Sequence, residues 1–222
     1  MSSEDILFVF DIDGTLTDSV SAHQNAFKAA LRQLGVELFN DRFHTFKHHT
    51  DSFIASEIYS VSTGTEMSVD LMSKFEKELM TSLIEEPILE IPGATRLIKD
   101  LLSSRKHNLC FATGSLKEPA LYKLKMIGIE VDPRLVVSSN DIHDRETIVS
   151  KAISQAELFY NVPSFKKIVS VGDGIWDLIT AQNLGIDFIG VGEKNKTALV
   201  QSGMHRHCVD FSHVGANTLV IA

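Results

Sequence analysis

Two pairs of aspartates follow apolar runs that have the composition of buried strands. Asp11 and Asp13 come directly after residues 6–10, and Asp173 and Asp177 follow residues 168–171. Such runs are typical of parallel sheets, which bind ligands at the carboxyl ends of their strands. Clustered carboxylates repel one another unless a cation neutralises them, and Mg²⁺ prefers oxygen ligands. The two pairs therefore predict an acidic, metal-binding site at one edge of a sheet.

A third apolar run, residues 109–112, ends in Thr113, Gly114 and Ser115. The hydroxyls and free backbone N–H groups of such a segment are the donors that a phosphoryl group requires. Each of the three strand ends, taken alone, has the composition of an ordinary polar turn. Together, two acidic ends and one hydroxyl-glycine end are hard to explain as solvent-exposed turns, and they favour a site for phosphate chemistry.

An alternation of strands and helices positions these residues. Strands are expected at 6–10, 109–112, 135–138, 168–171 and 187–191, and helices at 94–102, 119–127, 147–160 and 175–184. Repeated units of this kind predict a doubly wound parallel α/β sheet. For residues 192–222 we expect one helix and a final short strand.

The region after the first strand has a different character. Helical periodicity replaces strand-like runs, with helices expected at 18–34, 51–61 and 67–84. Pro87 and the pair Pro92-Gly93 mark the return to the alternating pattern. We therefore predict an α/β core of residues 1–17 and 88–222, interrupted by a helical domain of residues 18–87.

The composition limits the possible partners and location. A net charge of −8 over 222 residues argues against nucleic acid or an anionic membrane as a partner. Two isolated cysteines favour a reducing compartment, and the sequence shows neither a signal peptide nor an apolar run of membrane-spanning length. We expect a cytoplasmic protein.

The motifs resemble those of the haloacid dehalogenase superfamily. Asp11-Ile-Asp-Gly-Thr-Leu-Thr-Asp, Thr113-Gly-Ser and Gly172-Asp-Gly-Ile-Trp-Asp are similar, in this order, to the first, second and fourth motifs of that family. The helical insert resembles the cap of its phosphoglycolate phosphatase and β-phosphoglucomutase branch. Several separate motifs agree, which makes the resemblance specific.

The resemblance implies a Mg²⁺-dependent phosphatase acting on a small phosphomonoester, either phosphoglycolate-like or a sugar phosphate, as a monomer or homodimer. Asp11 would be the nucleophile that forms an aspartyl-phosphate, and Asp13 the general acid and base. The metal ligands would be Asp11, the backbone carbonyl of Asp13, and Asp173, with Asp177 holding the water shell of the metal.

The phosphoryl oxygens would be held by Thr113 and Gly114, together with a cation that forms the third motif of the family. Arg145 precedes the helix that leads to the Asp173 strand, where the family places this cation. Lys151 lies six residues further on and is the second candidate. We favour Arg145, although the family more commonly has lysine.

We expect polar residues of the helical insert to contact the substrate and determine which substrate is accepted. The candidates are His23, His48, His49, Thr50 and Asp51. A lone histidine on an apolar face, such as His23, is more often a satisfied core residue. His44 and His48 have the i, i+4 spacing of a zinc pair, but no cysteine or acid evidently completes such a site.

Other functions remain to be weighed. A β-phosphoglucomutase-type phosphomutase is the nearest rival, because that branch also has a histidine where His23 stands. A non-enzymatic module that accepts a phosphoryl group, like a response-regulator receiver domain, or that only binds phosphorylated ligands, is disfavoured by the large insert and by Asp13. Dehalogenase activity is disfavoured because carbon–halogen cleavage does not require the acid that Asp13 supplies.

Overall fold

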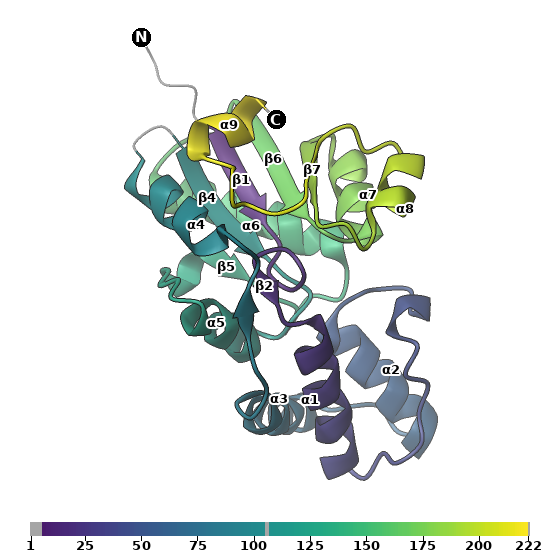
Figure 1. Ribbon diagram of the computed structural model, residues 1–222. Helices are drawn as coiled ribbons and strands as arrows, with labels where there is room; N and C mark the ends of the chain where they lie inside the picture. The colour runs from purple at the N-terminus through teal and green to yellow at the C-terminus, as the bar shows by residue number, and fades with distance from the viewer. Residues whose placement is uncertain (1–5, 105–106, 222) are drawn as a thin grey trace.

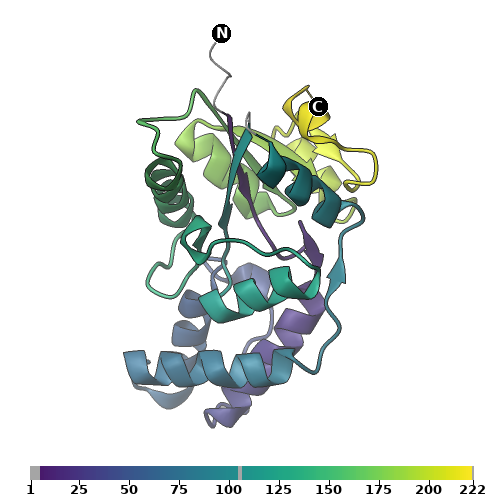
Figure 2. The ribbon, with the colours of Figure 1, turned by 90° about the vertical axis from the view of Figure 1, so that its left-hand side faces the viewer.

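The computed structural model describes residues 6–104 and 107–221 and contains a six-stranded sheet with helices on both faces (Figures 1 and 2). The strand order is β5-β4-β1-β6-β7-β8, and all neighbours are parallel. The fold class predicted from the sequence is confirmed. The strands are β1 Ile6–Phe10, β4 His107–Ala112, β5 Val136–Val137, β6 Lys167–Gly172, β7 Asp187–Val191 and β8 His207–Cys208.

The central strand β1 is buried along its whole length because helices cover both faces of the sheet. Phe8 and Phe10 belong to one apolar cluster, with residues of α4 (Ala94–Ser103), α5 (Lys117–Met126) and α9 (Ala216–Ile221). Leu7 and Val9 point the opposite way, into a cluster formed with α6 (Arg145–Tyr160). The period-2 alternation of strand side chains thus divides the core into two layers.

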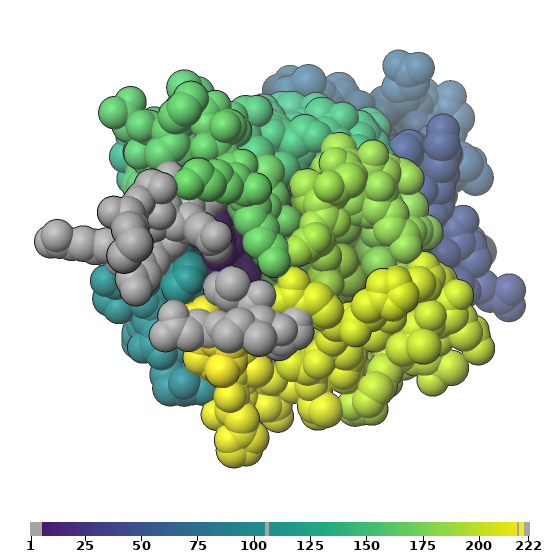
Figure 3. All heavy atoms as spheres, turned by 90° about the horizontal axis from the view of Figure 1, so that it is seen from above, coloured from purple at the N-terminus to yellow at the C-terminus, as the bar shows by residue number. Residues whose placement is uncertain are grey.

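Helices α7 (Ile175–Leu184) and α8 (Lys196–Gln201) pack on β7 through a smaller apolar cluster. The expected strand at 135–138 is shorter than predicted, because a 3₁₀ turn, η2 (Pro133–Leu135), precedes β5. The predicted C-terminal order is wrong. The chain forms α8, then β8, then α9, so the short strand lies between two helices and does not end the chain. Figure 3 shows this C-terminal segment at the end of the core away from the helical insert.

The helical insert, called the cap below, consists of α1 (Val20–Gln33), the 3₁₀ turn η1 (Phe43–Thr45), α2 (Asp51–Thr63) and α3 (Val69–Leu83). It has an apolar core of its own, in which the rings of Phe27 and Phe75 meet edge to face with centroids 4.8 Å apart. Ser68 caps α3 by accepting a hydrogen bond from the backbone N–H of Leu71.

The two chain crossings between core and cap pair with each other. Thr17–Asp18 (β2) and Leu89–Glu90 (β3) form a two-stranded antiparallel sheet beside the main one (Figure 1). Strands of two residues carry too little pattern to be recognised in the sequence, and we did not predict them. The proposed boundaries at 17/18 and 87/88 stay a prediction. None of the described helices is long and apolar enough to span a membrane.

Candidate active site

Strand register brings the predicted motifs to one edge of the sheet. Phe10, the last residue of β1, lies beside Phe111 of β4 and Val171 of β6. The three strands therefore end nearly level, so that Asp11, Thr113 and Asp173 emerge next to one another. This arrangement is what the sequence pattern predicted for the carboxyl ends of parallel strands.

Three of the aspartates form an acidic cluster. Asp11, Asp173 and Asp177 each offer a carboxylate oxygen, and these atoms lie within 4.8 Å of one another. Glycine permits the close approach. Gly14 has a φ of +82°, and a Cβ there would lie 2.5 Å from Oδ2 of Asp173. A Cβ on Gly172 would meet Oδ2 of Asp177 at the same distance.

The cluster is strained electrostatically. Burial and the charge of Asp177 raise the pKa of Asp173 to about 7, and burial together with the neighbouring carboxylates raises the pKa of Asp11 well above its usual range. Oδ1 of Asp173 is buried and has no hydrogen-bond partner in the described part of the chain. Buried, repelling oxygen ligands with an orphaned acceptor fit a divalent cation such as Mg²⁺, which would neutralise them.

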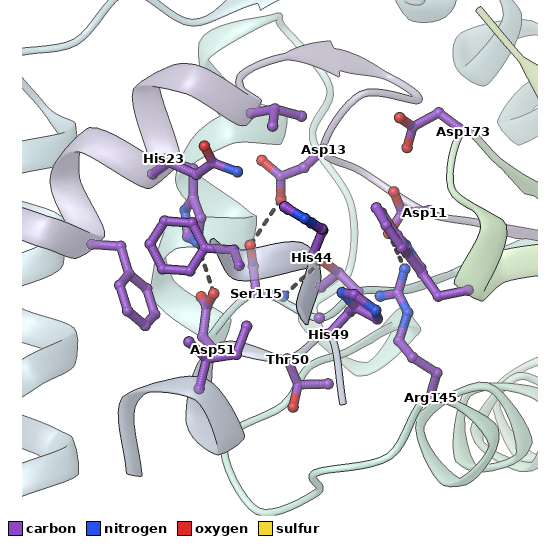
Figure 4. A pocket seen from close by; sticks show the side chains of 18 of the residues that line it. Asp11, Asp13, His23, His44, His49, Thr50, Asp51, Ser115, Arg145 and Asp173 are labelled. Carbon is purple, nitrogen blue, oxygen red and sulfur yellow. Dashed lines mark hydrogen bonds and ion pairs between the residues drawn. The ribbon is translucent and has the colours of Figure 1, made fainter. Parts of the chain in front are cut away.

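Arg145 is the cation of this site. It is the first residue of α6 and is buried, with an exposed fraction of 8%. Its Nη2 donates to Oδ1 of Asp11 at 3.1 Å (Figure 4). The same Nη2 also donates to Oδ1 of Asp177. Lys151, the second candidate, is exposed and lines a separate hollow with Lys117 and Arg134. The geometry therefore brings Arg145, and not Lys151, to the acidic cluster.

Asp13 lies in a different electrostatic environment. Its two carboxylate oxygens each accept a hydrogen bond from Nζ of Lys123 at 2.7 Å, and one also accepts from Oγ of Ser115 at 2.8 Å. The other accepts from Oγ of Ser19. Burial alone would raise the pKa of Asp13, but the charges of Lys123 and His23 hold it well below its ordinary value. Its carboxylate is thus paired with a lysine and is not part of the acidic cluster, and metal binding by its backbone carbonyl stays a prediction.

The loop after β4 provides small and hydroxyl-bearing groups beside Asp11. Thr113 is almost fully buried, and its Oγ1 accepts a hydrogen bond from the backbone N–H of Ser115. From the opposite side, Oγ1 of Thr15 donates to Oδ2 of Asp11. Thr113, Gly114 and Ser115 all line the cavity described below, as a phosphate-holding loop requires.

Residues 49–51 of the cap are tied directly to the core. The backbone N–H of Asp51 donates to the carbonyl of Gly114 at 2.8 Å, and Oγ1 of Thr50 donates to the carbonyl of His143 at 2.8 Å. The ring of His49 stacks on Trp176, with centroids 4.5 Å apart. We name this segment, residues 49–51, the latch.

The remaining cap candidates separate into two groups. Nε2 of His23 lies 2.9 Å from Oδ1 of Asp51, whose other oxygen accepts from the backbone N–H of Leu116. His23 is buried in the cap, and it also lines the cavity described below. His48 packs edge to face on Phe53 and is not among the cavity-lining residues, whereas the neighbouring His44 is.

A cavity of about 420 Å³ lies between the acidic cluster and the cap. Figure 4 shows side chains from the core strands and from the cap converging on it. Its size suits a small organic molecule. Its walls include Asp11, Asp13, Thr113 and Arg145 from the core and His23 and His49 from the cap.

Sequence reasoning did not identify Lys123 or Ser19. A signal for Lys123 was present: it stands three residues after Ala120 and seven after Leu116, both buried, so helical spacing places it on the inward face of α5. Trp176, which lies between the two acids of the last motif, packs on His49 of the cap.

The fold and the site together define a parallel α/β core with a helical cap and an acidic site at the sheet edge, and comparison with known proteins gives the family. The family model for haloacid dehalogenase-like hydrolases matches residues 8–191, so the chain belongs to that family. A search of curated proteins found no match.

Solved structures share the fold over nearly the whole chain. CbbY from Rhodobacter sphaeroides, in complex with phosphate, is 19% identical, with a TM-score of 0.73 and coverage of 99% of this chain and 100% of that one. A putative β-phosphoglucomutase from Bacteroides vulgatus is 16% identical, with a TM-score of 0.69 and coverage of 99% and 90%. A predicted phosphoglycolate phosphatase from Haemophilus somnus is 18% identical, with a TM-score of 0.63 and coverage of 97% and 96%.

Proposed function

We propose that this hydrolase is a Mg²⁺-dependent phosphatase that cleaves a small phosphomonoester through an aspartyl-phosphate. The observation that carries the proposal is the pairing of Asp11 with Arg145 on the wall of the cavity, beside the hydroxyl-bearing loop at Thr113. A carboxylate nucleophile next to a fixed guanidinium is suited to attack on phosphorus, because the cation stabilises charge on the transferring oxygens. The phosphate bound to CbbY supports the same chemistry by analogy of fold.

Each residue of the site would have a separate role in the two chemical steps. Asp11 attacks phosphorus, and Asp13, in its protonated form, gives its proton to the departing alkoxide. A water molecule then attacks the aspartyl-phosphate, and the Asp13 carboxylate takes a proton from that water, which restores the protonated form for the next cycle. The N–H and O–H groups of the loop at Thr113 and Gly114, with Arg145, hold the phosphoryl oxygens. Mg²⁺, which Asp11, Asp173 and Asp177 would hold, supplies charge neutralisation when bound.

The cap determines the rest of the substrate. His23, His49, Thr50 and Asp51 all line the cavity on the side facing the acidic cluster. The cavity volume fits a phosphorylated metabolite of the size of phosphoglycolate or a sugar phosphate, and we propose that class as the substrate.

The test is phosphate release from a panel of small phosphomonoesters, with Mg²⁺ and with EDTA, comparing wild type with Asp11→Asn. We expect metal-dependent release that Asp11→Asn abolishes, since the amide cannot act as the nucleophile. The matched control is Asp141→Asn, which alters an exposed acid outside the cavity and should leave release unchanged. Full activity in Asp11→Asn would refute the mechanism.

A phosphomutase is the second candidate, favoured by the His23–Asp51 pair at the cavity and by the structural likeness to a putative β-phosphoglucomutase. A mutase returns its phosphoryl group to the sugar and does not lose it to water. Isomerisation of a sugar phosphate without net phosphate release would therefore select the mutase over the phosphatase.

A further inference from the structure

Lys123 is a buried cation that the reaction scheme above does not use. It lies in the middle of α5 with an exposed fraction of 0%. Its ammonium group has three acceptors: the two carboxylate oxygens of Asp13, each at 2.7 Å, and Oγ of Ser115 at 2.8 Å. A lysine has three N–H donors, so the group is fully satisfied.

Burying a charged lysine in the core carries a large free-energy cost. Removing an ammonium group from water carries a desolvation cost that only well-placed partners offset, and an apolar side chain of similar volume often stabilises a core as well or better. The neighbouring α5 residues Ala120 and Leu124 are themselves buried and apolar, so the local environment would accept one. Stability alone therefore gives a poor reason for a lysine here.

The acid–base carboxylate is held from three directions. Ser19 stands immediately before cap helix α1, Ser115 belongs to the loop after β4, and Lys123 comes from α5. Lys123 is not among the cavity-lining residues, whereas Asp13 and Ser115 are. Any effect of Lys123 on a substrate in the cavity must therefore pass through these two side chains.

We propose that Lys123 is a positioning residue that fixes the Asp13 carboxyl group on the leaving-group side of the cavity and keeps it from joining the acidic cluster around Arg145. Without this anchor, the Asp13 carboxylate loses the one partner that contacts both of its oxygens and is held only by the hydroxyls of Ser19 and Ser115. The inference rests on the proposed function, since it assigns Lys123 to the proton-transfer step of that reaction. Misplacing a catalytic group by about 1 Å is enough to reduce a rate about 100-fold.

The experiment compares two substrates that differ in their need for a proton donor. Glycerol 3-phosphate releases an alkoxide that must be protonated, whereas p-nitrophenyl phosphate releases a stabilised anion that leaves without a proton. In Lys123→Met we expect kcat for glycerol 3-phosphate to fall about 100-fold with KM nearly unchanged, and kcat for p-nitrophenyl phosphate to fall less than about 5-fold. Lys125→Met, which alters an exposed lysine of the same helix, is the matched control and should change neither value.

A second comparison separates positioning from general damage. In an Asp13→Asn background, Lys123→Met should no longer change the ratio of the two kcat values, because both substitutions act on the same step. Equal losses on both substrates, or a further change of the ratio in the Asp13→Asn background, would overturn the proposal.

A variant that does not fold and a wild type that is inactive have different consequences for the proposal. If Lys123→Met does not fold, as judged by circular dichroism, Ser115→Ala carries the test, since it removes a group that contacts both Lys123 and Asp13. An unchanged ratio in a folded Ser115→Ala would then overturn the proposal. Wild-type protein that releases phosphate from none of the phosphomonoesters of the panel would refute the proposed function, and the inference with it, whereas an active wild type with equal losses in the variant refutes the inference alone.

Discussion

Replacing a proposed metal ligand, Asp173→Asn, should stabilise the metal-free protein. The pKa of Asp173 is raised by burial and by Asp177 from an ordinary value near 3.8 to about 7. Ionising this side chain in the folded protein is thus disfavoured by about three powers of ten, or about 4 kcal/mol at pH 8. The asparagine removes that cost but leaves a buried amide with imperfect hydrogen bonding, which costs about 1–3 kcal/mol. The net expectation is a gain of about 1–3 kcal/mol in the free energy of unfolding.

The assay is urea unfolding at pH 8 in EDTA, followed by the same measurement in excess Mg²⁺. Wild type should gain about 2.7 kcal/mol when the free metal is 100 times its dissociation constant, whereas Asp173→Asn should gain much less. The pH dependence has a definite sign. Because the folded pKa lies above the unfolded one, the folded protein binds more protons between pH 4 and 7, so metal-free wild type becomes more stable as the pH falls from 8 to 5.5.

The variant should lose the part of this pH effect that Asp173 contributes, because asparagine does not titrate, and should keep the part that comes from the raised pKa of Asp11. Asp141→Asn, at an exposed position, is the control and should leave both the metal effect and the pH effect intact. The reasoning is refuted if Asp173→Asn is less stable than wild type in EDTA at pH 8, or if Mg²⁺ stabilises the two proteins equally.

Two further substitutions test other contacts of the site. Arg145→Met leaves the buried carboxylates of Asp11 and Asp177 without their cation, so it should lower the free energy of unfolding by about 3–5 kcal/mol and abolish phosphate release. The control, Lys151→Met, lies on the surface and should change the free energy of unfolding by less than about 0.5 kcal/mol. Equal effects of the two substitutions in urea titrations would contradict the assignment of Arg145. Gly114→Ala places a Cβ 2.3 Å from the carbonyl oxygen of His49, so it should displace the latch and lower kcat/KM about 10–100-fold. The control, Gly215→Ala, creates no close contact and should leave kcat/KM unchanged. Unaltered steady-state kinetics in Gly114→Ala would contradict the close packing of Gly114 on the latch.

Much of the fold and of the acidic cluster could be predicted because they depend on local pattern and on a topological rule. An apolar run followed by Asp11 or Asp173 identifies a buried strand with a polar end, and parallel strands place such ends together without any knowledge of long-range contacts. The choice of Arg145 came instead from the resemblance to the family, which places a cation before the helix that leads to the Asp173 strand.

The Lys123–Asp13 pair could not be predicted in this way. The two residues are 110 positions apart, and α5 contains three lysines with similar local sequence, so only the packing of the helix on the sheet selects the buried one. The pairing of β2 with β3 is also non-local and involves strands of only two residues. For His48, residue type and spacing indicated a site residue, but the side chain packs on Phe53.

The latch has a consequence for how this enzyme must cycle. The cap is joined to the core by the β2–β3 crossings and, at a separate place, by the contacts of Asp51 with Gly114 and of Thr50 with His143. The Gly114 carbonyl that holds the cap belongs to the loop that would hold the phosphoryl group under the proposed function. A ligand that orders this loop therefore favours the docked cap, and undocking the cap releases the loop in turn, because a coupling free energy acts equally in both directions. Under the proposed function, phosphate binding and cap docking are therefore coupled: bound phosphate raises the population of the docked cap, and the docked cap raises the affinity for phosphate by the same factor.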